Sequence, residues 1–258
     1  MTDIESQREH FEQISETYYQ ARRKKNHILI KRLMWDFFFE GKEVLFPKPI
    51  AVLEPMCGYA EGLSILRDRV PVPISYEGFD YSENLIAKVK AQDPSLNVRV
   101  AEVTSFKSDG KFDLVILIGG LHHVFRHTEE VVRNLSSVLV DGGHFINLEP
   151  THNNPIARLA REMIYKRSKF FDENTERGFD LVELDEVFLT AGFEKADQIY
   201  PGLLSHILYY NPDAFPWLNA GGEGLVRFLF GMEKRFYRSW VARKLSFATL
   251  TLWRKRTA

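Results

Sequence analysis

A glycine-containing turn between an expected strand and an expected helix carries the most specific chemistry in the sequence. The stretch Ile50–Gly62 begins with an apolar run that ends at Glu54, and Gly58 follows in the turn. A glycine lets a ligand approach the backbone closely, and the first turn of a helix presents free N–H groups to it. A dinucleotide-binding GxGxxG pattern would need glycines where Met56 and Glu61 stand, which counts against NAD(P).

A second acidic residue, Asp80, ends the next apolar run, some two dozen residues after the glycine turn. A carboxylate accepts two hydrogen bonds from a vicinal diol, so this spacing suits a ribose-binding acid in a nucleotide-binding fold. The alternative is that Asp80 caps the helix that begins at Ser82. Glu54 has the same alternative, a helix-capping acid.

Two adjacent histidines, His122 and His123, follow the most apolar run of the chain. A histidine titrates near neutral pH and is a natural general base. If the segment is extended, the two side chains point to opposite sides, so we expect at most one to face the site. We find no partners at metal-ligand spacing and predict no metal. The single cysteine, Cys57, is expected to be a buried small hydrophobe rather than a reactive thiol.

The elements that must position these residues alternate from residue 50 onward, after an N-terminal stretch whose pattern indicates helices. Expected strands are 50–53, 71–79, 97–100, 112–118, 144–148, 193–199 and 245–253. Expected helices lie between them, including 82–91, 128–139, 154–165 and 181–190, with a break at Asp141-Gly142-Gly143. This alternation predicts an α/β fold with a largely parallel sheet and helices on both faces.

Five stretches, taken in order, resemble the class I S-adenosylmethionine-dependent methyltransferases. Glu54 and Gly58 match the family's acidic-x-Gly-x-Gly-x-Gly pattern, although Met56 and Ala60 replace the outer glycines. The other four matches are 78–82 with Asp80, 101–103 with Glu102, 112–124 with its Leu-His-His-Val run, and 131–145 with its Asp-Gly-Gly turn. The Leu-His-His-Val run is common in the small-molecule branch that includes ubiquinone-biosynthesis methyltransferases.

The resemblance implies a Rossmann-like seven-stranded, mostly parallel sheet that binds S-adenosylmethionine and releases S-adenosylhomocysteine. Carried over residue by residue, it implies that Asp80 binds the ribose hydroxyls, that Glu102 and the Val103 backbone bind adenine, and that Tyr18 or Tyr19 lies near the sulfonium. The full set of expected cofactor-binding residues is Tyr19, Glu54, Met56, Gly58, Asp80, Tyr81, Glu102, Val103 and Gly119.

For an acceptor that must lose a proton, the expected catalytic residues are His123 and then His152. His152 lies in the stretch 149–155 after the fifth strand, where the resemblance places acceptor-facing residues.

The composition of the chain limits the classes of molecule that it is expected to bind. The 258 residues carry 34 Lys and Arg against 35 Asp and Glu, and 45% of them are apolar. A net charge of −1 argues against a dedicated nucleic-acid binder, so we expect a small-molecule acceptor. The polar N-terminus is no secretory signal and the one cysteine fits a reducing compartment, so we expect a cytoplasmic protein.

The C-terminal part, from Gly221 onward, combines basic residues with aromatic ones. A basic, aromatic helix can lie on a membrane surface, and this segment could also cover an apolar or lipid-linked acceptor. We favour the simpler alternative, in which these aromatic side chains pack on the sheet and close the pocket.

We therefore expect one methyltransferase domain over residues 1–258. It comprises an N-terminal helical flap (1–47), a cofactor-binding core (50–200), and an acceptor-side helical insertion with the last strand (201–258). The expected reaction is O- or N-methylation of a small molecule, such as a glycan, lipid-linked or natural-product intermediate. The rivals are an NAD(P) oxidoreductase and a non-enzymatic scaffold or regulator.

Overall fold

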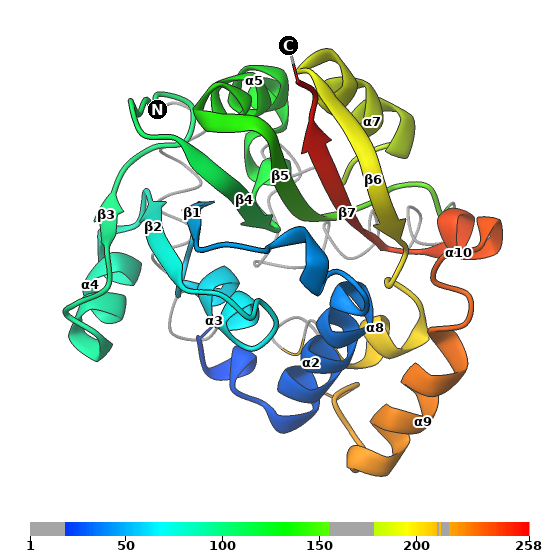
Figure 1. The fold of residues 1–258 in the computed structure, drawn as a ribbon. Coiled ribbons are helices and arrows are strands. Elements are labelled where there is room, and N and C mark those ends of the chain that lie inside the picture. Colours follow the sequence, from blue (N-terminus) through cyan, green and yellow to red (C-terminus); the bar gives the residue numbers. More distant parts are fainter. Residues whose placement is uncertain (1–18, 155–177, 211, 213–216, 258) are drawn as a thin grey trace.

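The computed structural model describes residues 19–154, 178–210, 212 and 217–257. Its centre is a seven-stranded sheet with the order β3-β2-β1-β4-β5-β7-β6 (Figure 1). The strands are β1 (Ile50–Pro55), β2 (Ile74–Asp80), β3 (Val98–Val100), β4 (Phe112–Ile118), β5 (Leu139–Pro150), β6 (Phe193–Ile199) and β7 (Ala248–Lys255). The first five pair in parallel, and β7 runs antiparallel to both of its neighbours. The predicted Rossmann-like, mostly parallel sheet is confirmed.

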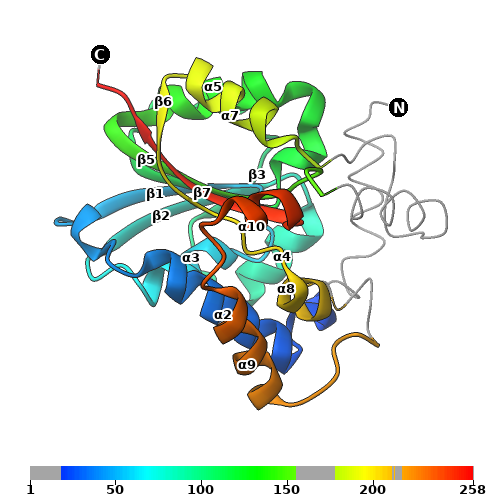
Figure 2. The ribbon, with the colours of Figure 1, turned by 90° about the vertical axis from the view of Figure 1, so that its right-hand side faces the viewer.

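Helices cover both faces of the sheet, as Figure 2 shows edge-on. One face carries α5 (Thr128–Val138) and α7 (Leu181–Thr190), and the other carries α2 (Lys25–Phe39), α3 (Glu61–Arg67), α4 (Glu83–Gln92), α8 (Leu204–Tyr209) and α9 (Glu223–Glu233). Two short 3₁₀ segments, Glu43–Leu45 and Leu121–His127, and the helix α10 (Trp240–Leu245) complete the described elements.

Strand β4 shows why the sheet needs both helical layers. Leu114 and Ile116 belong to the core beneath α2 and α3, whereas Val115 and Leu117 belong to the core beneath α5 and α7. Successive side chains of a strand point to opposite faces, so an unbroken apolar run requires cover on both sides. Helix α2 supplies part of that cover, because Trp35 and Phe38 are completely buried.

The fifth strand begins earlier than the sequence predicts. The sequence favours a strand from His144 after a turn at 141–143, but β5 already starts at Leu139, which pairs with Phe112. The glycine pair lies where the register between β4 and β5 shifts, and not in a turn that precedes the strand; Gly142 takes a φ of 75° there. A bulge inserts residues without ending a strand, which a turn-like sequence does not reveal.

The expected helix at 154–165, apart from its first residue, and residues 1–18 of the expected N-terminal helical stretch lie outside the described residues. The last strand is displaced from the predicted 245–253 to Ala248–Lys255, because Leu245 still belongs to α10. The expected packing of the C-terminal aromatic residues is correct for Phe230, Tyr237 and Trp253, which are buried. It is wrong for Phe228, Phe236 and Trp240, which are exposed.

Candidate functional site

The predicted site residues gather where parallel strands end. Glu54 lies at the carboxyl end of β1, Asp80 at that of β2, Gly119 directly after β4, and Glu149 near the end of β5. In open α/β sheets ligands bind outside the carboxyl ends of the strands, so these residues occupy the expected edge.

The turn after β1 holds three alternate residues in the left-handed conformation. The φ angles are 52° at Met56, 51° at Gly58 and 58° at Ala60. A side chain in this conformation costs roughly 1–2 kcal/mol, which is why the pattern favours glycine there. The two substituted positions therefore keep the glycine-type backbone. The Met56 side chain turns toward Gly120, and a Cβ added to that glycine would lie 3.0 Å from the Met56 Sδ.

Glu54 ties this turn to the helix that follows. Its Oε1 accepts a hydrogen bond from the Gly62 N–H at 2.7 Å, and its Oε2 accepts from the Leu63 N–H at 3.1 Å and from the Tyr76 hydroxyl at 2.7 Å. Burial raises the pKa of Glu54 to about 7, and these hydrogen bonds oppose the rise. The structure thus shows the capping arrangement, and a contact of Glu54 with the cofactor remains a prediction.

A buried lysine lies close to the same helix end. Lys31 of α2 forms an ion pair with Glu61, the first residue of α3, and Glu54 adds its negative charge. Burial nevertheless lowers the pKa of Lys31. Cys57, in the glycine turn, is buried, and burial raises the pKa of its thiol, which agrees with the expected small hydrophobe.

Asp80 connects the glycine turn to the start of α4. Its Oδ2 accepts from the Gly58 N–H at 3.0 Å and its Oδ1 from the Ser82 N–H at 2.9 Å. The carboxylate is buried, and burial raises its pKa. The backbone of Tyr81 also acts on this carboxylate. A carboxylate has about four acceptor positions, so the arrangement leaves capacity for a further donor such as a ribose hydroxyl. The Ser82 hydroxyl caps α4, because it accepts a hydrogen bond from the Leu85 N–H.

The residues expected around adenine and at the N-terminal segment lie on both sides of Asp80. Glu102 and Val103 follow β3; the Glu102 carboxylate accepts a hydrogen bond from Thr104 and the Val103 side chain is buried. Tyr81 is half-buried after β2. The Tyr19 ring packs on Tyr59 of the glycine turn with centroids 4.8 Å apart. Tyr18 lies outside the described residues.

Glu149 is the residue of this edge that the sequence analysis missed. It is fully buried, and its carboxylate accepts from the N–H groups of Gly120 (3.2 Å), Leu121 (2.9 Å) and His122 (3.3 Å). Its Oε2 also lies 3.0 Å from Nδ1 of His122. Burial raises the pKa of Glu149 to about 7, against the hydrogen bonds and the charge of His123. An acid at a strand end, like Glu54 and Asp80, could have indicated it.

The two adjacent histidines lie side by side, contrary to the expectation that they point apart. Their ring centroids are 4.0 Å apart, because the segment Leu121–His127 is a 3₁₀ turn and not an extended strand. His123 acts electrostatically on both Asp80 and Glu149, so it faces the site as well. His152 is half-buried, and its backbone N–H donates to Phe179.

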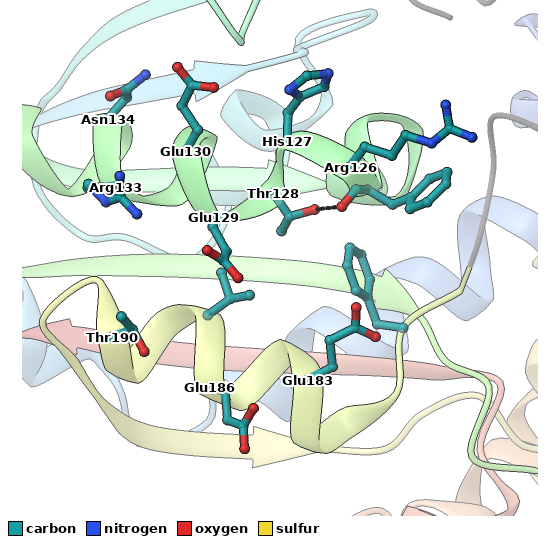
Figure 3. A pocket seen from close by; sticks show the side chains of 13 residues that line it. Arg126, His127, Thr128, Glu129, Glu130, Arg133, Asn134, Glu183, Glu186 and Thr190 are labelled. Atoms are coloured by element: carbon teal, nitrogen blue, oxygen red, sulfur yellow. Dashed lines mark hydrogen bonds between the residues drawn. The ribbon is translucent and has the colours of Figure 1, made fainter.

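A groove of about 680 Å³ lies away from these residues, between α5 and α7 (Figure 3). Carboxylates from both helices line it, namely Glu129, Glu130, Glu183 and Glu186. None of the predicted cofactor or catalytic residues contributes to its wall. Among the described residues, no group of three or more His, Cys, Asp or Glu side chains is arranged to hold a metal ion.

Comparisons with known proteins identify the family and the fold of this chain. The profile of a family described as "Methyltransferase domain" matches residues 22–198. The fold resembles magnesium protoporphyrin IX methyltransferase from Synechocystis PCC 6803 with bound S-adenosylhomocysteine (TM-score 0.63, 10% identity, covering 98% of this chain and 100% of that one). It also resembles the cyclopropane synthase MmaA2 from Mycobacterium tuberculosis (TM-score 0.59, 13% identity, covering 86% of this chain and 83% of that one). A third similar structure is the [4+2]-cyclase SpnF (TM-score 0.56, 18% identity, covering 86% of this chain and 80% of that one). The search of curated proteins found no match.

Replacing Gly62 by alanine tests how firmly Glu54 is held. A Cβ at this position would lie 2.8 Å from the Glu54 carboxyl carbon, and three hydrogen bonds prevent that carboxylate from moving aside. We expect G62A to lower the free energy of unfolding in urea by about 1–3 kcal/mol. The control is G231A in α9, where a Cβ meets nothing within 4 Å and helix propensity should add about 0.5–1 kcal/mol. If both variants change the free energy of unfolding equally, the Glu54 carboxylate is not held rigidly in place.

Replacing Glu149 by glutamine tests its raised pKa. Between about pH 4.5 and 7 the folded protein keeps a proton on Glu149 that the unfolded chain has lost, so this residue makes stability fall as pH rises through that window. In urea unfolding at pH 5, 6, 7 and 8, the free energy of unfolding of E149Q should fall less with rising pH than that of the unsubstituted protein. E130Q, which removes an exposed carboxylate, should leave this pH dependence unchanged. If E149Q shows the same pH dependence as the unsubstituted protein, the pKa of Glu149 is not raised.

Proposed function

The chain belongs to the class I S-adenosylmethionine-dependent methyltransferase family, and from that premise we propose that it methylates an oxygen or nitrogen of a small-molecule acceptor. The chain is thus an enzyme whose cofactor is S-adenosylmethionine, which excludes the alternative of an NAD(P) oxidoreductase. The observation that supports a working cofactor site most strongly is the joint geometry of Gly58 and Asp80. Despite two lost glycines, the turn keeps its left-handed backbone, and Asp80 holds it by hydrogen bond.

The residues at the strand ends fit this cofactor. A Cβ on Gly58 would meet nothing within 4 Å, so space lies open beside its backbone. A Cβ on Gly119, whose φ is also positive, would meet only His122 Cε1, at 3.8 Å. Asp80 would bind the ribose hydroxyls, and Glu102 with the backbone of Val103 would bind adenine.

The remaining predicted contacts surround the methionine part of the cofactor. We assign the backbone of Met56 and Gly119, together with Tyr19 and Tyr81, to this part, and Glu54 to positioning α3. When bound, S-adenosylmethionine supplies an electrophilic methyl group on a sulfonium. What this chain must add is alignment of the acceptor, exclusion of water and removal of a proton.

For proton removal we propose His122 in place of the expected His123. Its Nδ1 faces the buried Glu149 carboxylate, which orients the ring and stabilises the imidazolium that forms when Nε2 takes a proton. His123 packs on the same ring and also faces the site, so it is the second candidate. His152, beyond the end of β5, is proposed as an acceptor contact rather than the base.

Asp80→Asn tests the cofactor site directly. The amide presents its NH₂ where the carboxylate accepts, so we expect S-adenosylhomocysteine to bind about 10- to 100-fold more weakly in titration calorimetry. The control is Asp68→Asn at the end of α3, an exposed side chain that should leave the affinity unchanged. No binding of S-adenosylhomocysteine to the unsubstituted protein would instead support a non-enzymatic scaffold.

His122→Gln and His123→Gln distinguish the two candidate bases. We expect H122Q to lower the rate of S-adenosylhomocysteine release about 10²- to 10⁴-fold with an acceptor that carries a hydroxyl, and to remove the neutral-pH inflection of the rate. H123Q should keep that inflection. The readout is release across a panel of phenols, sugars and amphipathic alcohols, with cofactor affinity measured in parallel. The opposite pattern would assign the base to His123.

A further inference from the structure

Helix α9 presents two apolar faces, and only one of them is covered by the protein. Val226 and Phe230 are buried, and Phe230 packs against Tyr237. Leu225, Phe228 and Met232 follow the spacing of a second stripe and are exposed, with 63% of Phe228 accessible. A globular helix normally buries its apolar stripe, so this second stripe needs a partner.

More exposed apolar residues follow in the sequence after α9. The Phe236 N–H donates to the Glu233 carbonyl and the Ser239 N–H to that of Phe236, so two turns lead from α9 to α10. Phe236 and Trp240 are exposed, the latter to 68%, and so are Val241 and Leu245. We call the set of Leu225, Phe228, Met232, Phe236, Trp240, Val241 and Leu245 the apolar strip.

Basic side chains border the apolar strip. Between residues 222 and 247 the sequence has six Lys or Arg against two acids. Both acids are engaged: Glu223 with Arg227, and Glu233 with the Ser205 N–H and hydroxyl. Four of the basic residues are exposed and have no ion pair with a described acid, namely Lys234, Arg235, Arg243 and Lys244. Lys244 lies over the Trp240 ring.

We propose that the apolar strip and its basic border dock on the surface of an anionic lipid membrane. Aromatic side chains favour the interface between headgroups and acyl chains, and each Lys or Arg near an anionic surface strengthens binding roughly fivefold. In this proposal the strip lies along the membrane surface. No helix within the described residues is long and apolar enough to span a bilayer.

Docking would bring the acceptor side of the site to the membrane. The Asn154 side chain donates to the carbonyl of Leu245 at 2.6 Å, and Thr151 Oγ1 donates to that of Ser246. The last residue of α10 is therefore attached to the loop after β5, where the proposed function places acceptor contacts. This link to the acceptor rests on the proposed function, whereas the docking itself does not.

Co-sedimentation of the full chain with vesicles tests the proposal. Binding is expected to vesicles of 70% phosphatidylcholine and 30% phosphatidylglycerol and to be about tenfold weaker or more with phosphatidylcholine alone. F228A/W240A and K234E/R235E should each bind the anionic vesicles about tenfold more weakly or worse. The matched controls V44A/V182A and K90E/K107E change exposed residues elsewhere and should bind normally.

Three outcomes would overturn the docking proposal. The first is that the unsubstituted protein does not sediment with anionic vesicles, and the second is that all variants bind those vesicles equally. The third is that the protein forms a dimer without lipid and that F228A/W240A dissociates this dimer, which would assign the strip to contact with a second copy. Calorimetry with S-adenosylhomocysteine in the absence of vesicles separates this result from the proposed function. All variants should bind it normally, and failure of that binding in the unsubstituted protein would refute the function and not the docking.

Discussion

Buried carboxylates at the carboxyl ends of the strands are the constraint on which the whole site depends. Glu54, Asp80 and Glu149 each accept a hydrogen bond from the N–H of a glycine, namely Gly62, Gly58 and Gly120. A buried charge is costly unless it is hydrogen-bonded, and a buried N–H needs an acceptor, so each pair satisfies both partners. The loops that follow β1 and β4, and the start of α3, are therefore fixed by the strands themselves.

This constraint explains how the turn tolerates its unusual residues. Met56 and Ala60 stand where the family pattern has glycine, yet their φ angles match that of Gly58. The Gly62 and Gly58 N–H groups donate hydrogen bonds to Glu54 and Asp80 and so hold the backbone on both sides of the turn, and these bonds can offset a strain of roughly 1–2 kcal/mol per residue. The glycine-type geometry thus survives the loss of two of its glycines.

The sequence is most informative where the local physics narrows the choice of residue. The apolar run of β4, the glycine turn and the acid at the end of β2 are predictable because a two-sided core, a left-handed φ and a polar strand end each restrict the choice of residue. Other features depend on contacts between distant segments. The start of β5 depends on pairing between Leu139 and Phe112, which no local pattern encodes.

The histidines and the C-terminal helices are harder to predict for the same reason. Whether His122 and His123 point apart depends on the backbone of their segment, and that backbone is a 3₁₀ turn held by Glu149, 27 residues further along the chain. Aromatic residues in α9 and α10 fit a buried face and an exposed face equally well in sequence. The packing of α9 against α8 and against α2, which is distant in sequence, leaves Phe230 buried and Phe228 exposed.

Hydrogen exchange of the intact protein, with and without S-adenosylhomocysteine, tests most directly whether the cofactor binds at the carboxyl ends of the strands. We expect the ligand to slow amide exchange after β1, β2, β3 and β4, in residues 56–63, 80–82, 102–103 and 119–122. Exchange in the groove between α5 and α7 should not change. Protection confined to that groove, or no protection at the strand ends, would show that the strand ends are not the cofactor site.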